Sequence, residues 1–185
     1  MKKTAILFAK GYEEVEALTA VDLLRRAGIG CEIVSVGGER TVEGSHGITV
    51  KADRVFSETD FSDYDGVILP GGMPGTTNLA AEEKVLALLR EFSAAGKLTA
   101  AICAAPTVLA KAGLLGGKRA VCYPGMEDQL SGAIPGDDPA AVDGTVITSR
   151  GVGTAIDFSL AIVTYFLGKA AAEKLASSIV YRNGR

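Results

Sequence analysis

The sequence predicts a doubly wound α/β protein with a mostly parallel sheet and helices on both faces. Short apolar runs alternate along the chain with longer segments of helical periodicity. The runs are continuous rather than alternating, which indicates strands covered by helices on both faces. A first strand–helix–strand unit is complete by Val36, which is typical of a right-handed βαβ crossover.

The first unit begins with an apolar run over residues 4–9, which predicts a buried strand. Residues 13–27 have helical spacing, and we expect Val15 on the inward face of this helix. Acidic residues come first in the helix and two arginines come last, an order that complements the helix dipole. Gly28 ends the helix, and residues 31–36 predict the second strand.

The middle of the chain begins with a glycine-rich and charged stretch, residues 37–60. Within it, residues 47–53 predict a short strand or hairpin at the edge of the sheet. Residues 64–69 predict a third buried strand, which runs into the turn P-G-G-M-P-G at residues 70–75. Such a turn exposes backbone N–H groups. Residues 82–95 then predict a helix.

The segment 97–112 is the one around which we expect the rest to be organised. Its apolar start, up to Ile102, predicts a central strand, and its alanine-rich remainder predicts a helix. Pro106 suits the first turn of that helix, where a missing N–H costs nothing. Cys103 therefore falls at a strand-to-helix turn.

The C-terminal third is predicted to contain four strands and two helices. Asp143-Gly144 between apolar residues indicates a tight hairpin over residues 141–149. The other expected elements are a strand at 119–123, an irregular loop with one helical turn at 124–140, helices at 154–167 and 169–177, and an edge strand at 179–181.

Length and composition fit a single globular domain over residues 1–185. The chain is 48% hydrophobic and 22% charged, which argues against disorder. The net charge of −3 comes without a basic block, so no nucleic-acid partner is indicated. The N-terminal apolar run is too short for a signal peptide, and no run could span a bilayer, so we expect a cytoplasmic protein without membrane contact.

Three cysteines without a C-x-x-C pair suggest neither a disulfide framework nor a zinc site. The single histidine excludes a metal site built from several histidines, and we predict no metal. Cys31 and Cys122 lie within predicted strands, where a structural role is favoured. His46 lies in a loop or edge strand, and we interpret it as a surface residue or as a residue with its hydrogen-bonding groups satisfied.

Three unusual turns follow predicted strands, at residues 10–16, 70–75 and 103–106. Sites in such sheets lie at the carboxyl ends of the strands, so we expect these turns to converge. A thiol at a helix start has its thiolate favoured. The N–H of Ala104 and the Gly71-Gly72 turn would together form an oxyanion hole. Spacing alone also allows Cys103 to be a small buried hydrophobe.

Two further patterns near these turns are weaker indications of a functional site. The group Glu13, Glu14 and Glu16 is expected to be mostly a solvated first helical turn, with one member facing the sheet ends on the side of Val15. The segment G-V-G-T-A-I at 151–156 lacks the third glycine of a dinucleotide fingerprint, so it is weak evidence for such a site.

Four motifs, in order along nearly the whole chain, resemble the DJ-1 (ThiJ/PfpI) superfamily. They are A-K-G-Y-E-E-V-E at 9–16, V-I-L-P-G-G at 67–72, A-A-I-C-A-A-P at 100–106 and T-S-R-G-V-G-T-A at 148–155. The first and third are most similar to the DJ-1 branch. The resemblance implies a flavodoxin-like fold, a homodimer and a functional thiol at Cys103.

The resemblance also implies roles for other residues. Glu16 aligns with a glutamate beside the cysteine, and Gly72 and Ala104 align with backbone donors. Residues of the pocket or the dimer interface would be Gly71, Arg26, His46 and Tyr123. A buried carboxyl and a thiolate in contact cannot both ionise cheaply, so we predict that Glu16 is protonated and donates a hydrogen bond to the Cys103 sulfur.

The chain departs from the superfamily at two positions. Ala104 follows the cysteine where protease-like members have histidine, and Tyr123 stands where some DJ-1 relatives have one. No Cys–His dyad can form there, which argues against protease activity. The resemblance implies a cofactor-free enzyme acting on reactive 2-oxoaldehydes as a glyoxalase or deglycase. The alternative is an oxidative-stress sensor or redox-regulated chaperone with a cysteine that oxidises to sulfinate. No phosphate-binding loop supports a third label given to relatives, thiazole monophosphate biosynthesis.

Overall fold

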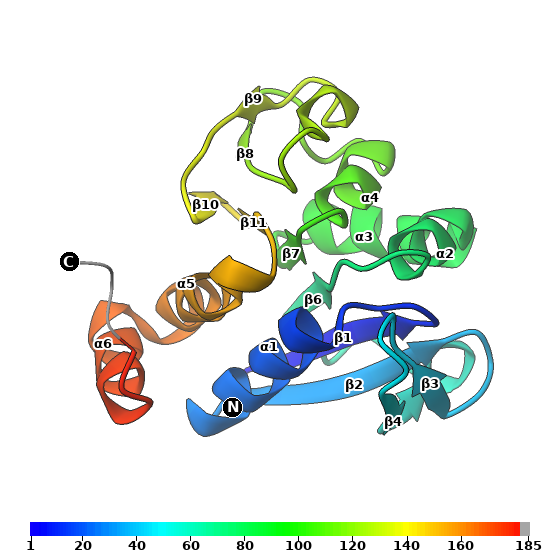
Figure 1. Ribbon diagram of the computed structural model, residues 1–185, viewed down its shortest axis with the longest axis horizontal. Helices are drawn as coiled ribbons and strands as arrows, with labels where there is room; N and C mark the ends of the chain where they lie inside the picture. The colour runs from blue at the N-terminus through cyan, green and yellow to red at the C-terminus, as the bar shows by residue number, and fades with distance from the viewer. Residues whose placement is uncertain (182–185) are drawn as a thin grey trace.

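A computed structural model describes residues 1–181, which fold into a seven-stranded sheet between two layers of helices (Figure 1). All neighbouring strands are parallel except the first pair, so the predicted doubly wound, mostly parallel sheet is confirmed. In spatial order the strands are β10 (Ala140–Asp143), β11 (Val146–Ser149), β7 (Leu98–Ile102), β6 (Gly66–Leu69), β1 (Lys3–Ala9), β2 (Gly30–Val36) and β5 (Arg54–Val55).

The two faces of the sheet carry separate apolar cores. Successive residues of β1 point to opposite faces, so Ile6 and Phe8 enter one core while Ala5 and Leu7 enter the other. Burial of each large side chain contributes roughly 1.5–3 kcal/mol. The first core is covered by α1 (Glu14–Arg26), α5 (Ala155–Leu167) and α6 (Lys169–Ser178), and the second by α2 (Gly75–Ala81), α3 (Glu83–Ala94) and α4 (Pro106–Lys111).

Two predicted strands pair outside the main sheet. The hairpin of β3 (Thr41–Glu43) and β4 (Thr49–Lys51) is a separate two-stranded sheet, so its prediction at the sheet edge is wrong; β5 occupies that edge. The strand predicted at 119–123 is limited to β8 (Arg119–Ala120). It pairs with β9 (Ile134–Pro135), because the excursion between α4 and β10 closes on itself above the sheet (Figure 1).

Other differences concern helices and the C-terminus. The helix α2, which starts directly after the 70–75 turn, was not expected. No strand forms at 179–181, because α6 ends in a turn and the Tyr181 hydroxyl donates to Asp157 Oδ1 at 2.8 Å. Val15 is 49% exposed, so its prediction as an inward residue of α1 is wrong.

The hairpin between β10 and β11 is confirmed, with Gly144 at a φ of 60° in its turn. One turn of 3₁₀ helix, Glu127–Gln129, lies in the loop where one helical turn was predicted. Among residues 1–181 there is no helix long and apolar enough to cross a membrane.

Candidate functional site

The loops after β1 and β6 touch at the carboxyl edge of the sheet. The Glu13 N–H donates to Gly71 O at 2.8 Å, and the Gly75 N–H donates to Gly11 O at 3.2 Å. Gly72 has a φ of 89°, and a Cβ built on it would lie only 2.3 Å from the Glu13 nitrogen. Glycine is therefore required at Gly72 for the two loops to meet. Because β7 neighbours β6, the three turns singled out in the sequence lie side by side.

Cys103 occupies a strained turn directly after β7. Its φ of 65° is in the left-handed region, which is uncommon for a residue other than glycine. Two hydrogen bonds hold this backbone: the Cys103 N–H donates to Ser149 O at 2.9 Å, and Cys103 O accepts from the Tyr123 N–H at 2.8 Å. Such strain costs on the order of 1–3 kcal/mol, and positions held in this way cluster at functional sites.

Backbone N–H groups of Gly72 and Ala104 lie at the Cys103 sulfur and act to lower the pKa of the thiol. These are the two donors that the resemblance indicated. The helix α4 begins at Pro106 and has only six residues. The neighbouring N–H groups, more than a helix dipole, are therefore what favours the thiolate in this turn.

Glu16 lies in the first turn of α1 and is fully buried. Its Oε2 accepts the N–H of Gly71 at 2.9 Å. Its Oε1 has no hydrogen-bond partner among the described residues. Glu14 is also buried, so the expectation that this acidic group is mostly solvated is wrong; only Glu13 keeps part of its surface.

The carboxyl of Glu16 interacts with the thiol of Cys103, and each shifts the pKa of the other. Burial raises the pKa of Glu16 to about 7. Burial, and then the charge of an ionised Glu16, raises the pKa of Cys103 to about 12. The N–H groups of the turn favour the thiolate, as expected, but burial and the charge of Glu16 outweigh them, so the pKa of the thiol is raised. Protonation of Glu16 removes the repulsion and leaves the carboxyl able to donate a hydrogen bond.

Cys103 and Glu16 open into a cleft of about 590 Å³, a volume suited to a small organic ligand. Tyr123 lies on the cleft wall and is about half exposed. Arg150 stands on another wall, and its Nη1 donates to Asp137 O at 3.0 Å. The lining residues are Glu13, Glu16, Gly72, Cys103, Tyr123, Pro124, Arg150, Gly151, Val152, Gly153 and Thr154.

Sequence reasoning did not assign Arg150 or the 151–154 segment to the site. This segment follows β11, which neighbours β7, so it reaches the same edge as Cys103. The T-S-R-G-V-G-T-A motif contains these residues, but only the order of the strands shows that they lie beside Cys103. Cys31 and Cys122 are buried and lie outside the cleft lining, as expected of structural cysteines.

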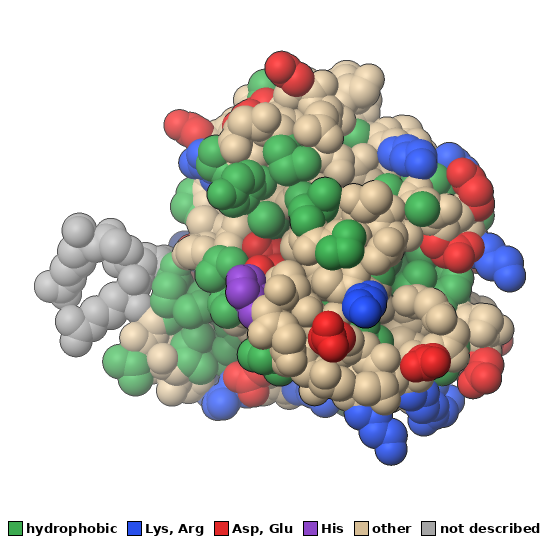
Figure 2. Space-filling model, turned by 45° about the vertical axis from the view of Figure 1, so that its right-hand side comes forward, with side chains coloured by type: hydrophobic (Ala, Val, Ile, Leu, Met, Phe, Trp, Pro, Cys, Tyr) green, Lys and Arg blue, Asp and Glu red, His purple; other side chains and the backbone are tan. Residues whose placement is uncertain are grey.

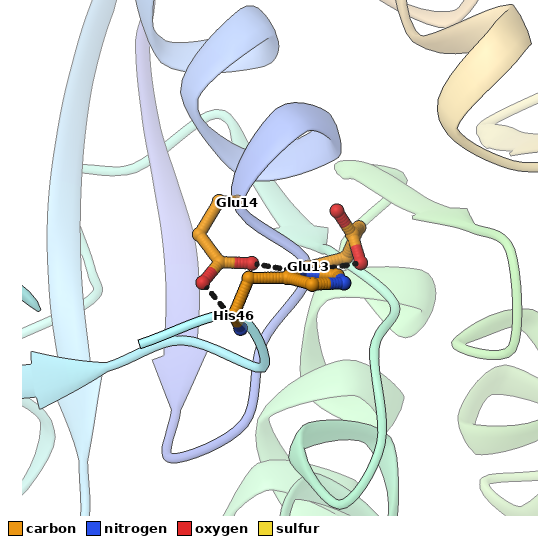
Figure 3. A group of neighbouring side chains, drawn as sticks. All are labelled: Glu13, Glu14 and His46. Atoms are coloured by element: carbon orange, nitrogen blue, oxygen red, sulfur yellow. Dashed lines mark hydrogen bonds and ion pairs between the residues drawn. The ribbon is translucent and has the colours of Figure 1, made fainter. Parts of the chain in front are cut away.

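Arg26 and His46 lie outside the cleft. Arg26, in the last turn of α1, is exposed, and its Nε donates to Asp22 Oδ2 at 2.6 Å. His46 lies in the loop between β3 and β4, with its Nδ1 3.0 Å from Glu14 Oε2 (Figure 3). It is an exposed residue, visible as the purple side chain in Figure 2, with polar partners, as the sequence indicated.

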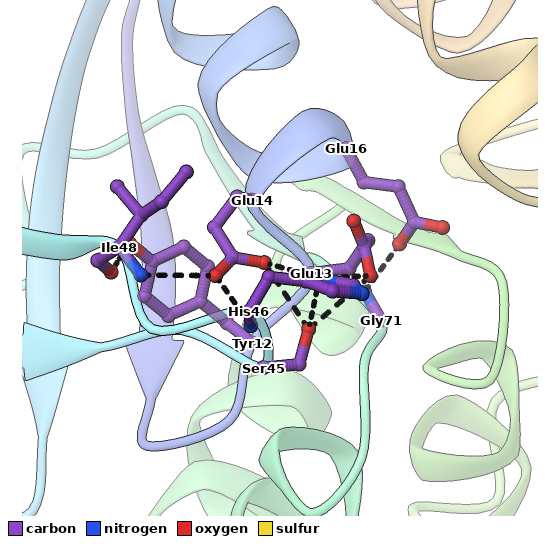
Figure 4. A network of polar contacts seen from close by, with 8 residues as sticks. All are labelled: Tyr12, Glu13, Glu14, Glu16, Ser45, His46, Ile48 and Gly71. Atoms are coloured by element: carbon purple, nitrogen blue, oxygen red, sulfur yellow. Dashed lines mark hydrogen bonds and ion pairs between the residues drawn. The ribbon is translucent and has the colours of Figure 1, made fainter.

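A polar network connects His46 to the cleft rim (Figure 4). Ser45 Oγ lies 3.2 Å from Glu13 Oε2 and 3.1 Å from Glu14 Oε2. Burial opposes ionisation of Glu14, but hydrogen bonds from His46 and from main-chain N–H groups lower its pKa to about 2. The contact with Glu14 raises the pKa of His46. Because Glu13 also lines the cleft, the network borders the site.

Comparison with known proteins agrees with the fold and with the arrangement around Cys103. The model of the DJ-1/PfpI family matches residues 2–165, and the chain belongs to this family. It is 38% identical to protein dj-1beta of Drosophila melanogaster over 181 residues, which cover 97% of each chain. It is also 33% identical to the deglycase PH1704 of Pyrococcus horikoshii, over 80% of this chain and 89% of that one.

Solved structures of DJ-1 proteins are also similar to this chain. A cysteine-to-alanine variant of the DJ-1 superfamily protein STM1931 from Salmonella typhimurium has a TM-score of 0.94 and 38% identity, covering 99% of this chain and 100% of that chain. An oxidised DJ-1 of Toxoplasma gondii has a TM-score of 0.95 and 37% identity, with the same coverage. The flavodoxin-like fold of this family is thereby shown.

Proposed function

We propose that the protein is a cofactor-free, cysteine-dependent enzyme that converts reactive 2-oxoaldehydes, with methylglyoxal giving lactate, or reverses their early adducts. The observation that carries this proposal is the pairing of Cys103 with a buried Glu16 at the floor of an open cleft. Membership of the family and the similarity to a protein named deglycase support it.

The first step uses the turn around Cys103. The sulfur adds to the aldehyde carbon and the carbonyl oxygen takes up a proton, which gives a hemithioacetal. N–H groups of Gly72 and Ala104 lie at the sulfur, near the position where the oxyanion develops. Together they would lower the barrier without a metal or a cofactor.

The second step needs one group that moves a proton between neighbouring carbons. Glu16 in its ionised form would accept the proton from the former aldehyde carbon and return it to the former keto carbon. The product is a thioester, and water then releases lactate and restores the thiol. The aldehyde carbon is oxidised and the keto carbon is reduced, so no external oxidant is required. A pKa of about 7 suits a group that must both accept and donate.

Lactate formation from methylglyoxal, compared between the wild type and Cys103→Ser, tests this proposal. We expect turnover in the wild type and loss of at least about 100-fold in Cys103→Ser, because the nucleophile is removed. Glu16→Gln should lose turnover while keeping its alkylatable thiol. Equal lactate formation by wild type and Cys103→Ser would overturn the proposal.

A second candidate function is oxidation sensing, favoured by the unpartnered Oε1 of Glu16. Two equivalents of peroxide would oxidise the thiol, through a sulfenic acid, to a sulfinate and be reduced to water. A protonated Glu16 and the N–H of Gly72 would then hold the sulfinate oxygens. Absence of turnover, together with stoichiometric sulfinate at Cys103 under mild peroxide in mass spectrometry, would favour the sensor over the enzyme.

We also propose that the protein forms a homodimer. Val15 on α1 and Ile48 beside β4 are large apolar residues that are 49% and 52% exposed. An interface over α1 and the β3–β4 hairpin would cover both. Analytical ultracentrifugation should give twice the chain mass for the wild type, and a monomer at micromolar concentration would contradict the proposal.

A further inference from the structure

Four atoms of metal-ligating type lie together at the rim of the cleft, at the start of α1 and in the loop between β3 and β4. They are Glu13 Oε2, Glu14 Oε2, Ser45 Oγ and His46 Nδ1. Figure 3 shows both carboxylates turned toward the imidazole, and Figure 4 adds the hydroxyl between them. The set combines an imidazole, two carboxylates and a hydroxyl, so it is more than an acidic surface patch.

Five separations between these atoms lie within the edge length of a tetrahedral zinc site or up to about 0.3 Å below it. His46 Nδ1 lies 3.0 Å from Glu14 Oε2, 3.5 Å from Glu13 Oε2 and 3.1 Å from Ser45 Oγ. Ser45 Oγ lies 3.2 Å and 3.1 Å from the same two carboxylate oxygens. Zinc bonds of about 2.0–2.2 Å at tetrahedral angles place ligands roughly 3.3–3.6 Å apart. Small side-chain movements would thus enclose an ion.

The central ligand is held in place by atoms that would not touch the metal. Glu14 is 3% exposed, and its Oε1 accepts the N–H of His46 at 2.7 Å and that of Ile48 at 3.4 Å. This arrangement leaves Oε2 for the cluster. A Cβ on Gly44 would lie 2.4 Å from Glu14 Oε1, so glycine there permits the close approach of the loop. Hydrogen bonds of this kind orient carboxylate ligands in metal sites.

The charge of the cluster also favours a cation. Among the described residues, the ion pairs of Glu13 and Glu14 are made with His46 alone; neither carboxylate has a lysine or arginine within ion-pair distance. Two carboxylates thus face one imidazole. A divalent ion would neutralise the two carboxylate charges. A set of one nitrogen ligand and several oxygen ligands in this geometry suits zinc.

We propose that Glu13, Glu14, Ser45 and His46 form a binding site for a divalent transition-metal ion of the zinc type, distinct from the Cys103 thiol. Cysteine spacing and histidine count gave no reason to expect a metal, because this site uses neither a thiolate nor a second histidine. It takes its ligands from the start of α1 and from the loop between β3 and β4, which the fold brings together.

Isothermal titration of the full chain with Zn²⁺, and absorption spectra with Co²⁺ as a probe, test the site. We expect one ion per chain and a Co²⁺ spectrum of tetrahedral type without the near-ultraviolet band of thiolate ligation. His46→Gln should weaken binding by at least about 10-fold, in line with losses seen on disturbing metal sites. His46 is exposed and its side chain supports no core, so the fold should survive this change.

Two further variants decide the location of the ion. Glu43→Gln removes an equal charge from the neighbouring strand β3 outside the cluster, so its affinity should stay within about 2-fold of the wild type. Cys103→Ser should also keep full binding. Binding that is lost in Cys103→Ser but retained in His46→Gln would assign the ion to the thiol and overturn the proposal. So would failure of the wild type to bind Zn²⁺ or Co²⁺.

Discussion

Glu16 Oε2 accepts a hydrogen bond from the backbone N–H of Gly71 at 2.9 Å, and this bond anchors the buried carboxyl to the loop after β6. The same glycine separates the two reactive groups. A Cβ built on Gly71 would lie 2.6 Å from Cys103 Cβ and 2.7 Å from Glu16 Oε2. The contact between the thiol and the carboxyl therefore depends on the absence of one methyl group.

Gly71→Ala should push Cys103 and Glu16 apart. Overpacking at a buried position costs about 1–3 kcal/mol of the free energy of unfolding, and the thiol should lose the influence of the carboxyl on its pKa. Urea denaturation measures the first effect. The pH dependence of thiol alkylation measures the second.

Gly116→Ala is the matched control for that substitution. A Cβ on Gly116 meets nothing within 4 Å, so its effect on stability should stay within about 0.5 kcal/mol. Thiol reactivity should match the wild type. Equal behaviour of the two alanine variants would show that the space at Gly71 does not organise the pair.

The charge and the hydrogen bonding of Glu16 can be separated by two substitutions. Glu16→Gln removes the charge but keeps a donor, so the pKa of Cys103 should fall well below its wild-type value of about 12. Glu16→Leu removes the charge and the donor but keeps the burial, so its thiol should titrate between the other two. Alkylation rates followed by mass spectrometry across pH report the order. Identical profiles in all three proteins would refute the role of Glu16.

The buried carboxyl of Glu16 should also make stability depend on pH. Its pKa is raised from 4.5 to about 7 in the folded state, so the folded protein binds more protons than the unfolded chain between these values. The free energy of unfolding should fall as pH rises through this window, by a contribution on the order of 3 kcal/mol. Glu16→Gln should flatten the fall in urea midpoints from pH 4.5 to 7. A slope unchanged by Glu16→Gln would place the titrating group elsewhere.

The sheet and the turn at Cys103 could be predicted because each rests on local sequence. Continuous apolar runs gave β1, β6 and β7 near their observed bounds, and Pro106 marked the start of α4. Burial of Glu14 was not predictable in this way. It follows from a contact with the loop between β3 and β4, about 30 residues along the chain, and nothing in the local charge pattern reports it.

Arg150 illustrates the same limit for the site. Its place on the cleft wall depends on β11 lying next to β7, and single-sequence periodicity does not give strand order. The strand predicted at 119–123 failed for a related reason. The run R-A-V-C-Y is apolar enough for the sheet, but the polar loop that follows turns back and pairs with it outside the sheet. Tertiary context, not local preference, decided both cases.

Two buried threonines provide a final test of what holds the cleft wall in place. Thr148 Oγ1, on β11, accepts the N–H of Val121 at 2.9 Å, and this bond ties the segment that leads to Tyr123 to the sheet. Thr148→Val would leave that buried N–H without a partner, at a cost of about 1–3 kcal/mol. Thr99, on the neighbouring β7, is equally buried, but its hydroxyl has no partner among the described residues. Thr99→Val should therefore be neutral or stabilising by up to about 1 kcal/mol. Urea midpoints of the two variants measure this difference, and destabilisation of equal size in both would mean that shape, rather than the hydrogen bond to Val121, sets the cost.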